Sequence, residues 1–305
     1  MKKGFFHELK KNRVLFLMLL PALLFFAVNN YIPMAGIYSA FTRYEFSKGL
    51  FGSPFTGLQN FEFLWKSNIL AKLTVNTILY NMAFIIIGNI LQMIIAILLS
   101  RIASRFYRRL TQSLIFFPYF VSFVLIGVLA YNLLNYETGA FNAMLKSLHM
   151  QPVDFYNTPG LWPLIIVLAY LWKYLGYGTI IYLASIMSIS DEYYEAAEMD
   201  GANIFQQIFY ITVPHLMPTF VILFLLSLGQ IMRGQFDLFY NLVGANGNLF
   251  DMTDIIDTYV YRSIRTNLDI GIATAAGLYQ SVFGFVIVMI TNHLIKKHNE
   301  DYALF

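Results

Sequence analysis

Hydrophobic residues in this chain gather into long runs that shorter polar stretches separate. A run of about 20 apolar residues is long enough to cross a bilayer as a helix. By this criterion the pattern predicts six membrane-spanning helices. The chain is therefore expected to be an all-α polytopic membrane protein with one transmembrane domain over residues 1–305. The approximate ranges of the predicted spans are 14–40, 74–100, 112–134, 161–186, 217–236 and 270–295.

The composition agrees with a chain that lipid must cover. Hydrophobic residues make up 58% of the sequence and charged residues only 12%, about half the share that a soluble domain carries. The absence of cysteine excludes disulfides, thiolate metal sites and a cysteine nucleophile. The net charge of +3 is too small to indicate a nucleic-acid partner.

Positive charges fix the expected orientation. Lysine and arginine are concentrated in the N-terminal tail (2–13), in the second loop (101–109) and after the last span (296–297). Segments rich in these residues remain in the cytoplasm, so both termini are expected inside a bacterial plasma membrane. A basic tail before an apolar run could also be a secretory signal peptide. This run continues to about residue 40, however, which is longer than a typical signal core.

The loop over 187–213 differs from the other loops predicted inside, because it has five acidic residues and no lysine or arginine. Ser190 followed by Asp191 and Glu192 predicts the start of a short helix, since a hydroxyl caps free amides and carboxylates are favoured there. Gly201 then allows a sharp turn before a second helical stretch. From the spacing alone, the loop could lie on the bilayer or be a surface for a partner protein.

The residues of this loop resemble a known motif. Glu195-Ala196-Ala197, Gly201-Ala202, Ile211, Pro214 and Pro218 match the EAA loop in permease subunits of binding-protein-dependent ATP-binding-cassette (ABC) importers. Further likenesses at 55–61, at Asn76-Thr77 and at Gly139 with Asn142 extend the resemblance over nearly the whole chain. The chain is most similar to the maltose-transporter class of carbohydrate importers. Its 254–262 segment resembles the subgroup for acidic oligosaccharides such as alginate and rhamnogalacturonan fragments.

The resemblance implies a type I importer fold and a set of partners. In such importers a second, homologous permease completes the pore, two cytoplasmic ATPases bind beneath it, and an external lipoprotein delivers the oligosaccharide. The loop would be the coupling helix, which docks in a cleft of the ATPase as a helix in a groove. The residues it would use for coupling are Glu195, Ala196, Ala197, Asp200, Gly201, Ala202, Ile211 and Pro214.

The sequence contains no motif that indicates catalysis by this chain. The Gly-x4-Gly-Lys-Ser/Thr pattern that cradles nucleotide phosphates is missing, so ATP and Mg²⁺ are expected on the partner ATPases and no cofactor on this chain. The five histidines show no metal-ligand spacing. We therefore expect a non-catalytic pore subunit without a metal site.

One basic residue is predicted inside the fourth span. A charge such as that of Lys173 costs about 2.5–3.5 kcal/mol at the centre of a membrane helix, so it should face the bundle interior or water. Tyr170, Trp172 and Tyr174 lie beside it in sequence. These aromatic rings could stack on sugar while the lysine binds hydroxyls or a carboxylate. Alternatively, Lys173 pairs with a polar group of a neighbouring helix.

A second candidate for cargo contact lies near the end of the fifth span. Arg233 precedes Asp237 by four residues, a spacing that favours an ion pair within one helix. Gln230 lies on the same side as Arg233, which keeps a role in the pore open. The predicted substrate path therefore consists of Tyr170, Trp172, Lys173, Tyr174, Gln230 and Arg233.

Two alternatives to sugar import remain at this point. The chain could be an ABC permease for a solute other than sugar. It could also be a secondary transporter that works without ATP, although such proteins often contain inverted repeats and no internal repeat is evident here.

Overall fold

The computed structural model describes residues 11–298, so the basic N-terminal tail over 1–10 lies outside the described residues. Within that range the chain is built from helices, and its only β-type pairing is one isolated bridge between Thr42 and Phe55. The α-helices are α2 (Arg13–Phe26), α3 (Gly49–Gly52), α4 (Gln59–Lys66), α5 (Ile69–Ser100), α6 (Arg105–Phe116), α7 (Phe123–Leu134), α8 (Ala140–Ser147), α9 (Trp162–Ile186), α10 (Asp191–Met199), α11 (Ile204–Gln207), α12 (Val213–Leu228), α13 (Phe236–Val243), α14 (Phe250–Thr253), α15 (Ile256–Arg265) and α16 (Ile270–His298).

Shorter elements extend or join these helices. Two of them are π-helical, Ala27–Tyr31 and Ile208–Thr212. The others are 3-10 helices at Ile32–Phe41, Phe117–Phe120, Phe155–Asn157, Pro159–Leu161 and Gly247–Leu249.

Five helical segments of the described chain are long and apolar enough to cross a membrane, and a bent pair of helices raises this to six if the pair is one span. The predicted all-α polytopic architecture is therefore confirmed. Four predicted spans are found close to their expected places, at Arg13–Phe41, Ile69–Ser100, Pro159–Ile186 and Ile270–Lys297.

The third span is not the single helix that the apolar run predicted. Arg105–Phe120 and Phe123–Leu134 meet at an angle of 96°. Pro118 lies in the 3-10 turn before the break, where it cannot donate a backbone hydrogen bond. Ser122 then starts the next helix by accepting a hydrogen bond from the backbone N–H of Leu125 at 3.3 Å. Both residues are small interruptions in an otherwise apolar run, so hydropathy alone did not reveal them.

The fifth span was predicted too far along the chain. Instead of 217–236 it runs over Ile204–Leu228, because α11, the π-helical turn and α12 form one continuous helical segment. The second half of the predicted 187–213 loop is therefore helical and continuous with α12. Pro214 is accommodated in the first turn of α12, directly after the wider π-helical turn.

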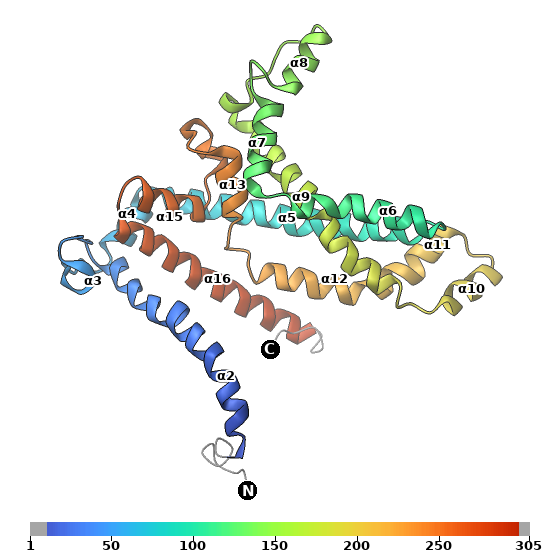
Figure 1. Cartoon of the computed structure of the whole chain (residues 1–305), viewed down its shortest axis with the longest axis horizontal. Helices are drawn as coiled ribbons and strands as arrows, with labels where there is room; N and C mark the ends of the chain where they lie inside the picture. The colour runs from blue at the N-terminus through green and yellow to red at the C-terminus, as the bar shows by residue number, and fades with distance from the viewer. Residues whose placement is uncertain (1–10, 299–305) are drawn as a thin grey trace.

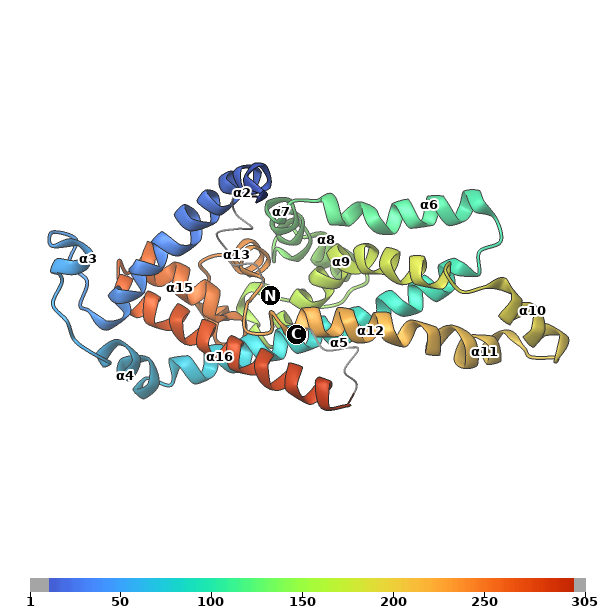
Figure 2. The same cartoon turned by 90° about the horizontal axis from the view of Figure 1, so that it is seen from below.

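The helices form an elongated bundle with distinct ends. Figures 1 and 2 show α10 at one end of the long axis and α3, α4 and α15 toward the other end. Helices α5 and α9 pack along each other and carry much of the buried core on their facing sides. Helix α2 leaves the bundle in Figure 1, and none of its residues is buried within the described chain. Its apolar surface is therefore available to lipid or to another chain.

Candidate functional site

The acidic loop begins with the helix that its sequence predicted. Ser190 is the N-cap of α10, and its hydroxyl accepts a hydrogen bond from the backbone N–H of Glu192 at 3.4 Å. Asp191 and Glu192 lie in the first turn, where the helix dipole favours carboxylates. Local capping chemistry is thus enough to place the start of α10 at Asp191.

Gly201 ends this helix in a left-handed turn. Its φ angle is +79°, a conformation that glycine adopts without a steric penalty. The N–H of Ala202 donates to the carbonyl of Ala197 at 2.8 Å, and that of Gly201 donates to Glu198 at 3.0 Å. This pair of bonds is the Schellman motif, with Asp200 as the C-cap. The predicted bend at Gly201 is confirmed.

A second cap fixes the exit from the turn. Asn203 and Gln206 form a capping box, in which each side chain accepts a hydrogen bond from the backbone N–H of the other, at 3.0 and 2.7 Å. Helix α11 therefore starts immediately after the Gly201 turn. The end of α10 and the start of α11 are both capped by local hydrogen bonds, so the loop is a defined helix-turn-helix.

Side chains from other elements attach this loop to the bundle. The Tyr194 hydroxyl lies 3.0 Å from Thr212 Oγ1 in the π-helical turn. The Arg101 guanidinium, directly after α5, lies 5.2 Å from the centre of the Tyr194 ring and donates to Gln207 Oε1 at 3.1 Å. From the sequence, Arg101 indicated only the topology of the chain. The signal that could have indicated the contact is the pair Gln206-Gln207, two polar residues between apolar ones, of which Gln207 is buried.

The opposite side of α10 faces outward. Glu195 and Ala196 are exposed, and Met199 is 89% exposed. Within residues 11–298 no hydrogen bond or ion pair engages the Glu195 carboxylate. Ala197 and Ala202 are half-buried, and the backbone hydrogen bond between them joins the end of α10 to the residue after Gly201. Ile211 and Pro214 lie farther along, in the π-helical turn and α12.

Lys173 is buried, with 5% of its surface exposed. Its ammonium group donates to the backbone carbonyls of Tyr119 at 3.0 Å and Val121 at 2.6 Å, and it lies 4.6 Å from the centre of the Phe123 ring. These carbonyls belong to the break in the third span, where regular helical partners are missing. The two predicted alternatives for Lys173 were contact with sugar and pairing with a polar group of a neighbouring helix, and these contacts match the second. Trp172 is instead 44% exposed at the bundle surface.

Tyr170 and Tyr174 line a cavity between the spans together with Tyr119 and Tyr177. Its volume is about 320 Å³, and Asn89, Gln92 and Ser227 supply polar groups to its wall. The Tyr170 ring stacks on Phe84 at a centroid distance of 3.9 Å. We call this space the aromatic cavity.

Gln230 and Arg233 line a separate space of about 500 Å³, which we call the polar cavity, with Asp257 and Gln280. The predicted ion pair between Arg233 and Asp237 is wrong, since none of the ion pairs within residues 11–298 joins them. The four-residue spacing assumed a helix, but α12 ends at Leu228 and Asp237 belongs to α13.

The turn that carries Arg233 is held by side chains from two other spans. Asn81 of α5 donates to the carbonyls of Ile231 at 2.8 Å and Arg233 at 3.2 Å. Gln280 of α16 donates to the Met232 carbonyl at 2.6 Å. These two amides satisfy backbone groups that the end of α12 leaves free. Sequence reasoning missed both residues, although a polar side chain inside an apolar span was their signal.

Asp257 is one of the polar residues that line the polar cavity. Its Oδ2 accepts hydrogen bonds from the Gly234 N–H at 2.8 Å and from Gln280 Nε2 at 2.9 Å. Burial raises the pKa of the Asp257 carboxyl, while these hydrogen bonds and the positive charge of Arg233 oppose the rise. A Cβ atom at Gly234 would lie 2.4 Å from Ile255 Cδ1, so any larger residue there would displace the Ile255 side chain.

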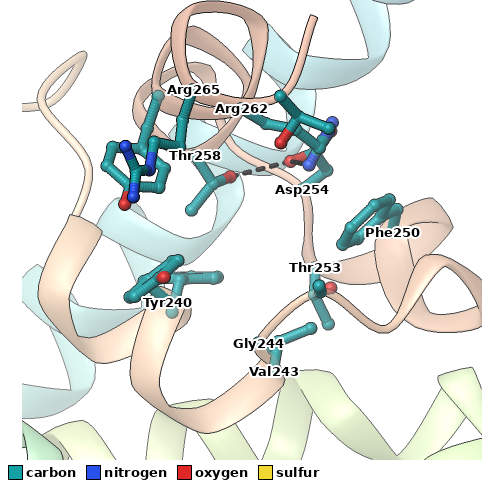
Figure 3. A pocket seen from close by; sticks show the side chains of 13 residues that line it. Tyr240, Val243, Gly244, Phe250, Thr253, Asp254, Thr258, Arg262 and Arg265 are labelled. Atoms are coloured by element: carbon teal, nitrogen blue, oxygen red, sulfur yellow. Dashed lines mark hydrogen bonds and ion pairs between the residues drawn. The ribbon is translucent and has the colours of Figure 1, made fainter.

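A third space, of about 210 Å³, lies between α13, α14 and α15. Figure 3 shows Asp254 and Arg262 side by side on its wall. Arg262 donates to both Asp254 oxygens, at 3.1 and 2.5 Å, and its guanidinium lies 4.1 Å from the centre of the Phe250 ring. Thr258 adds a hydrogen bond to Asp254 at 2.7 Å. We call this space the α13–α15 pocket.

Comparison with known proteins identifies relatives over almost the full chain. The model of the family described as binding-protein-dependent transport system inner membrane component matches residues 85–299. The polygalacturonan/rhamnogalacturonan transport system permease protein YteP of Bacillus subtilis (strain 168) is 30% identical over 98% of this chain and 93% of its own length. Protein LplB of the same organism is 30% identical over 96% of this chain and 92% of its own.

Solved structures share the fold. A chain in the crystal structure of a bacterial alginate ABC transporter, in complex with its alginate pentasaccharide-bound periplasmic protein, superposes with a TM-score of 0.86. It is 30% identical and is aligned over 97% of this chain and 98% of that chain. This protein therefore belongs to the family of binding-protein-dependent transport system inner membrane components.

Proposed function

We propose that this chain is one of two membrane-spanning subunits of an ATP-driven oligosaccharide importer and forms half of its pore. The observation that carries the proposal is the capped helix-turn-helix around Gly201, which presents Glu195 outward at one end of the bundle. An ABC transporter for alginate among the solved structures, and a permease named for polygalacturonan and rhamnogalacturonan, support an acidic oligosaccharide as cargo.

In this proposal α10 docks in a groove of a cytoplasmic ATPase. The exposed apolar side chain of Met199 fills the groove and the Glu195 carboxylate meets a basic group. ATP and Mg²⁺ bind to the ATPase pair, not to this chain. The ATPases bind α10 differently in their open and closed states, so nucleotide binding shifts the spans between two conformations. Arg101 and Tyr194 transmit the displacement to α5 and α12.

The cargo path in this proposal follows the two inner cavities. Ser227 lines the aromatic cavity and Gln230 lines the polar cavity, so both spaces border the end of α12. Tyr170 and Tyr174 offer ring faces for sugar, and Arg233 offers a guanidinium for a carboxylate. An external binding protein delivers the oligosaccharide at the end of the bundle opposite α10, and a second permease completes the path.

Reconstitution tests this function. The chain is co-expressed with the second permease and the ATPase encoded with it, purified as an assembly and placed in proteoliposomes. We expect uptake of trigalacturonate that requires both ATP and the binding protein. A lone oligomer that transports without ATP would identify a secondary transporter, and ATP-driven uptake of amino acids alone would identify a non-sugar permease.

Arg233→Gln is expected to lower uptake of an acidic trisaccharide about ten-fold, because a hydrogen bond to a charged group contributes roughly 1.5–3 kcal/mol. Uptake of a neutral trisaccharide should change little. Arg233→Lys is the matched control, since it retains the positive charge and should retain part of the activity. Both variants retain the backbone carbonyl of residue 233, which accepts the hydrogen bond from Asn81, so they differ only in the side chain. Equal losses for neutral and acidic cargo would instead assign Arg233 to the stability of the turn.

A further inference from the structure

The α13–α15 pocket is distinct from the proposed cargo path. It shares no lining residue with the polar cavity or the aromatic cavity. In Figure 1 the helices α13 and α15 lie far from α10 along the bundle. The pocket therefore lies toward the end that faces outside in the proposed orientation.

Its charged groups leave one positive charge without a partner. Asp254 lies against Arg262 and accepts both of its hydrogen bonds, so these two charges compensate each other. Arg265 lines the same pocket and is exposed, and within residues 11–298 no hydrogen bond or ion pair engages it. The ion pair fixes the wall, while the Arg265 guanidinium remains available to an anion.

Aromatic rings form the side of the pocket next to Arg265. The rings of Tyr240 and Tyr261 meet edge to face at a centroid distance of 5.0 Å, and Phe236 stacks on Tyr240 at 5.3 Å. Tyr240 is 43% exposed, so part of its ring is open to a ligand. A flat apolar ring face beside a guanidinium matches a sugar ring that carries a carboxylate. A phosphate ion would use the guanidinium but not the rings.

We propose that the α13–α15 pocket binds one uronate unit of an acidic oligosaccharide before the sugar enters the cargo path. The carboxylate is held by Arg265, and a face of the sugar ring packs on Tyr240 and Tyr261. A volume of about 210 Å³ is large enough for a single hexuronate ring. The proposal rests on the proposed function for its class of ligand, and it adds a site outside the pore.

A local fluorescence titration tests the pocket. The chain has no cysteine, so Thr266→Cys at the edge of the pocket introduces a single labelling site. The labelled chain is reconstituted in nanodiscs with its partner subunits and titrated with trigalacturonate. We expect a saturable signal whose Kd rises about ten-fold in Arg265→Gln. Lys146→Gln, which removes another exposed positive charge on α8, should leave the Kd unchanged.

The other outcomes overturn the proposal. An equal response in Arg265→Gln, or an equal response to a neutral trisaccharide, would exclude a uronate site. A signal that needs only the sugar-free binding protein would mean that an acidic side chain of that protein occupies the pocket. Uptake measured in parallel separates this test from the proposed function. Uptake by the wild type with no Arg265-dependent titration rejects the pocket alone, whereas an Arg265-dependent titration without ATP-driven uptake rejects the importer alone.

Discussion

Gly201→Val is expected to reduce ATP-driven uptake at least about ten-fold while the protein still inserts into the membrane. A β-branched residue at a φ of +79° costs roughly 1–2 kcal/mol or more, because its Cβ is too close to the backbone in the left-handed conformation. No atom lies within 4 Å of a Cβ built there, so the effect comes from the backbone and not from a clash. The turn would open, and α10 would lose its fixed direction toward the ATPase.

Gly201→Asn separates this explanation from a general sensitivity of the loop. Asparagine tolerates the left-handed region better than other side chains and should retain most of the uptake. Gly247→Val supplies a control in another loop, because Gly247 also has open space around it but no positive φ. Uptake and the amount of ATPase that co-purifies are measured for each variant. Normal uptake by Gly201→Val would contradict the coupling role of the loop.

The sequence predicted most accurately the features that neighbouring residues determine. The N-cap at Ser190 and the turn at Gly201 depend on hydrogen bonds within six residues, so residue types alone indicated them. Long apolar runs also located four of the spans, because a membrane helix makes all its backbone hydrogen bonds within one continuous segment.

Breaks in the spans could not be predicted in the same way. An interrupted helix inside a membrane is stable only if other groups satisfy its free carbonyls. Here those groups are the side chains of Lys173, Asn81 and Gln280, which lie on other spans 48 to 152 positions away in sequence. A hydropathy profile contains no record of these contacts, so it extended the third span through its bend and placed the fifth span too late.

The same limitation affected the predicted substrate path. The proposed pairing of Arg233 with Asp237 assumed a continuous helix, and it failed once α12 ended at Leu228. Asp257 and Gln280 could not be assigned to the polar cavity from the sequence, because α15 and α16 approach Arg233 only in the folded chain. The sequence could therefore indicate that a polar residue within a span has a role, but it could not indicate which residue is its partner.

Lys173→Met is expected to lower the free energy of unfolding by about 3 kcal/mol, the second large effect that we predict. Methionine keeps most of the volume of lysine but leaves the carbonyls of Tyr119 and Val121 without their donor, and an unsatisfied buried group costs roughly 1–3 kcal/mol. Thermal unfolding in detergent measures the change, and proteolysis near the bend between α6 and α7 reports whether the break has loosened.

Trp172→Leu is the matched control for this prediction, because it alters the preceding residue, which is 44% exposed at the bundle surface. Its stability should remain close to that of the wild type. The two alternatives for Lys173 give opposite results. If the ammonium stabilises the break between α6 and α7, the Lys173→Met variant is less stable and its uptake of neutral and acidic sugars falls equally. If the ammonium contacts cargo, stability is unchanged and only uptake of the acidic sugar falls.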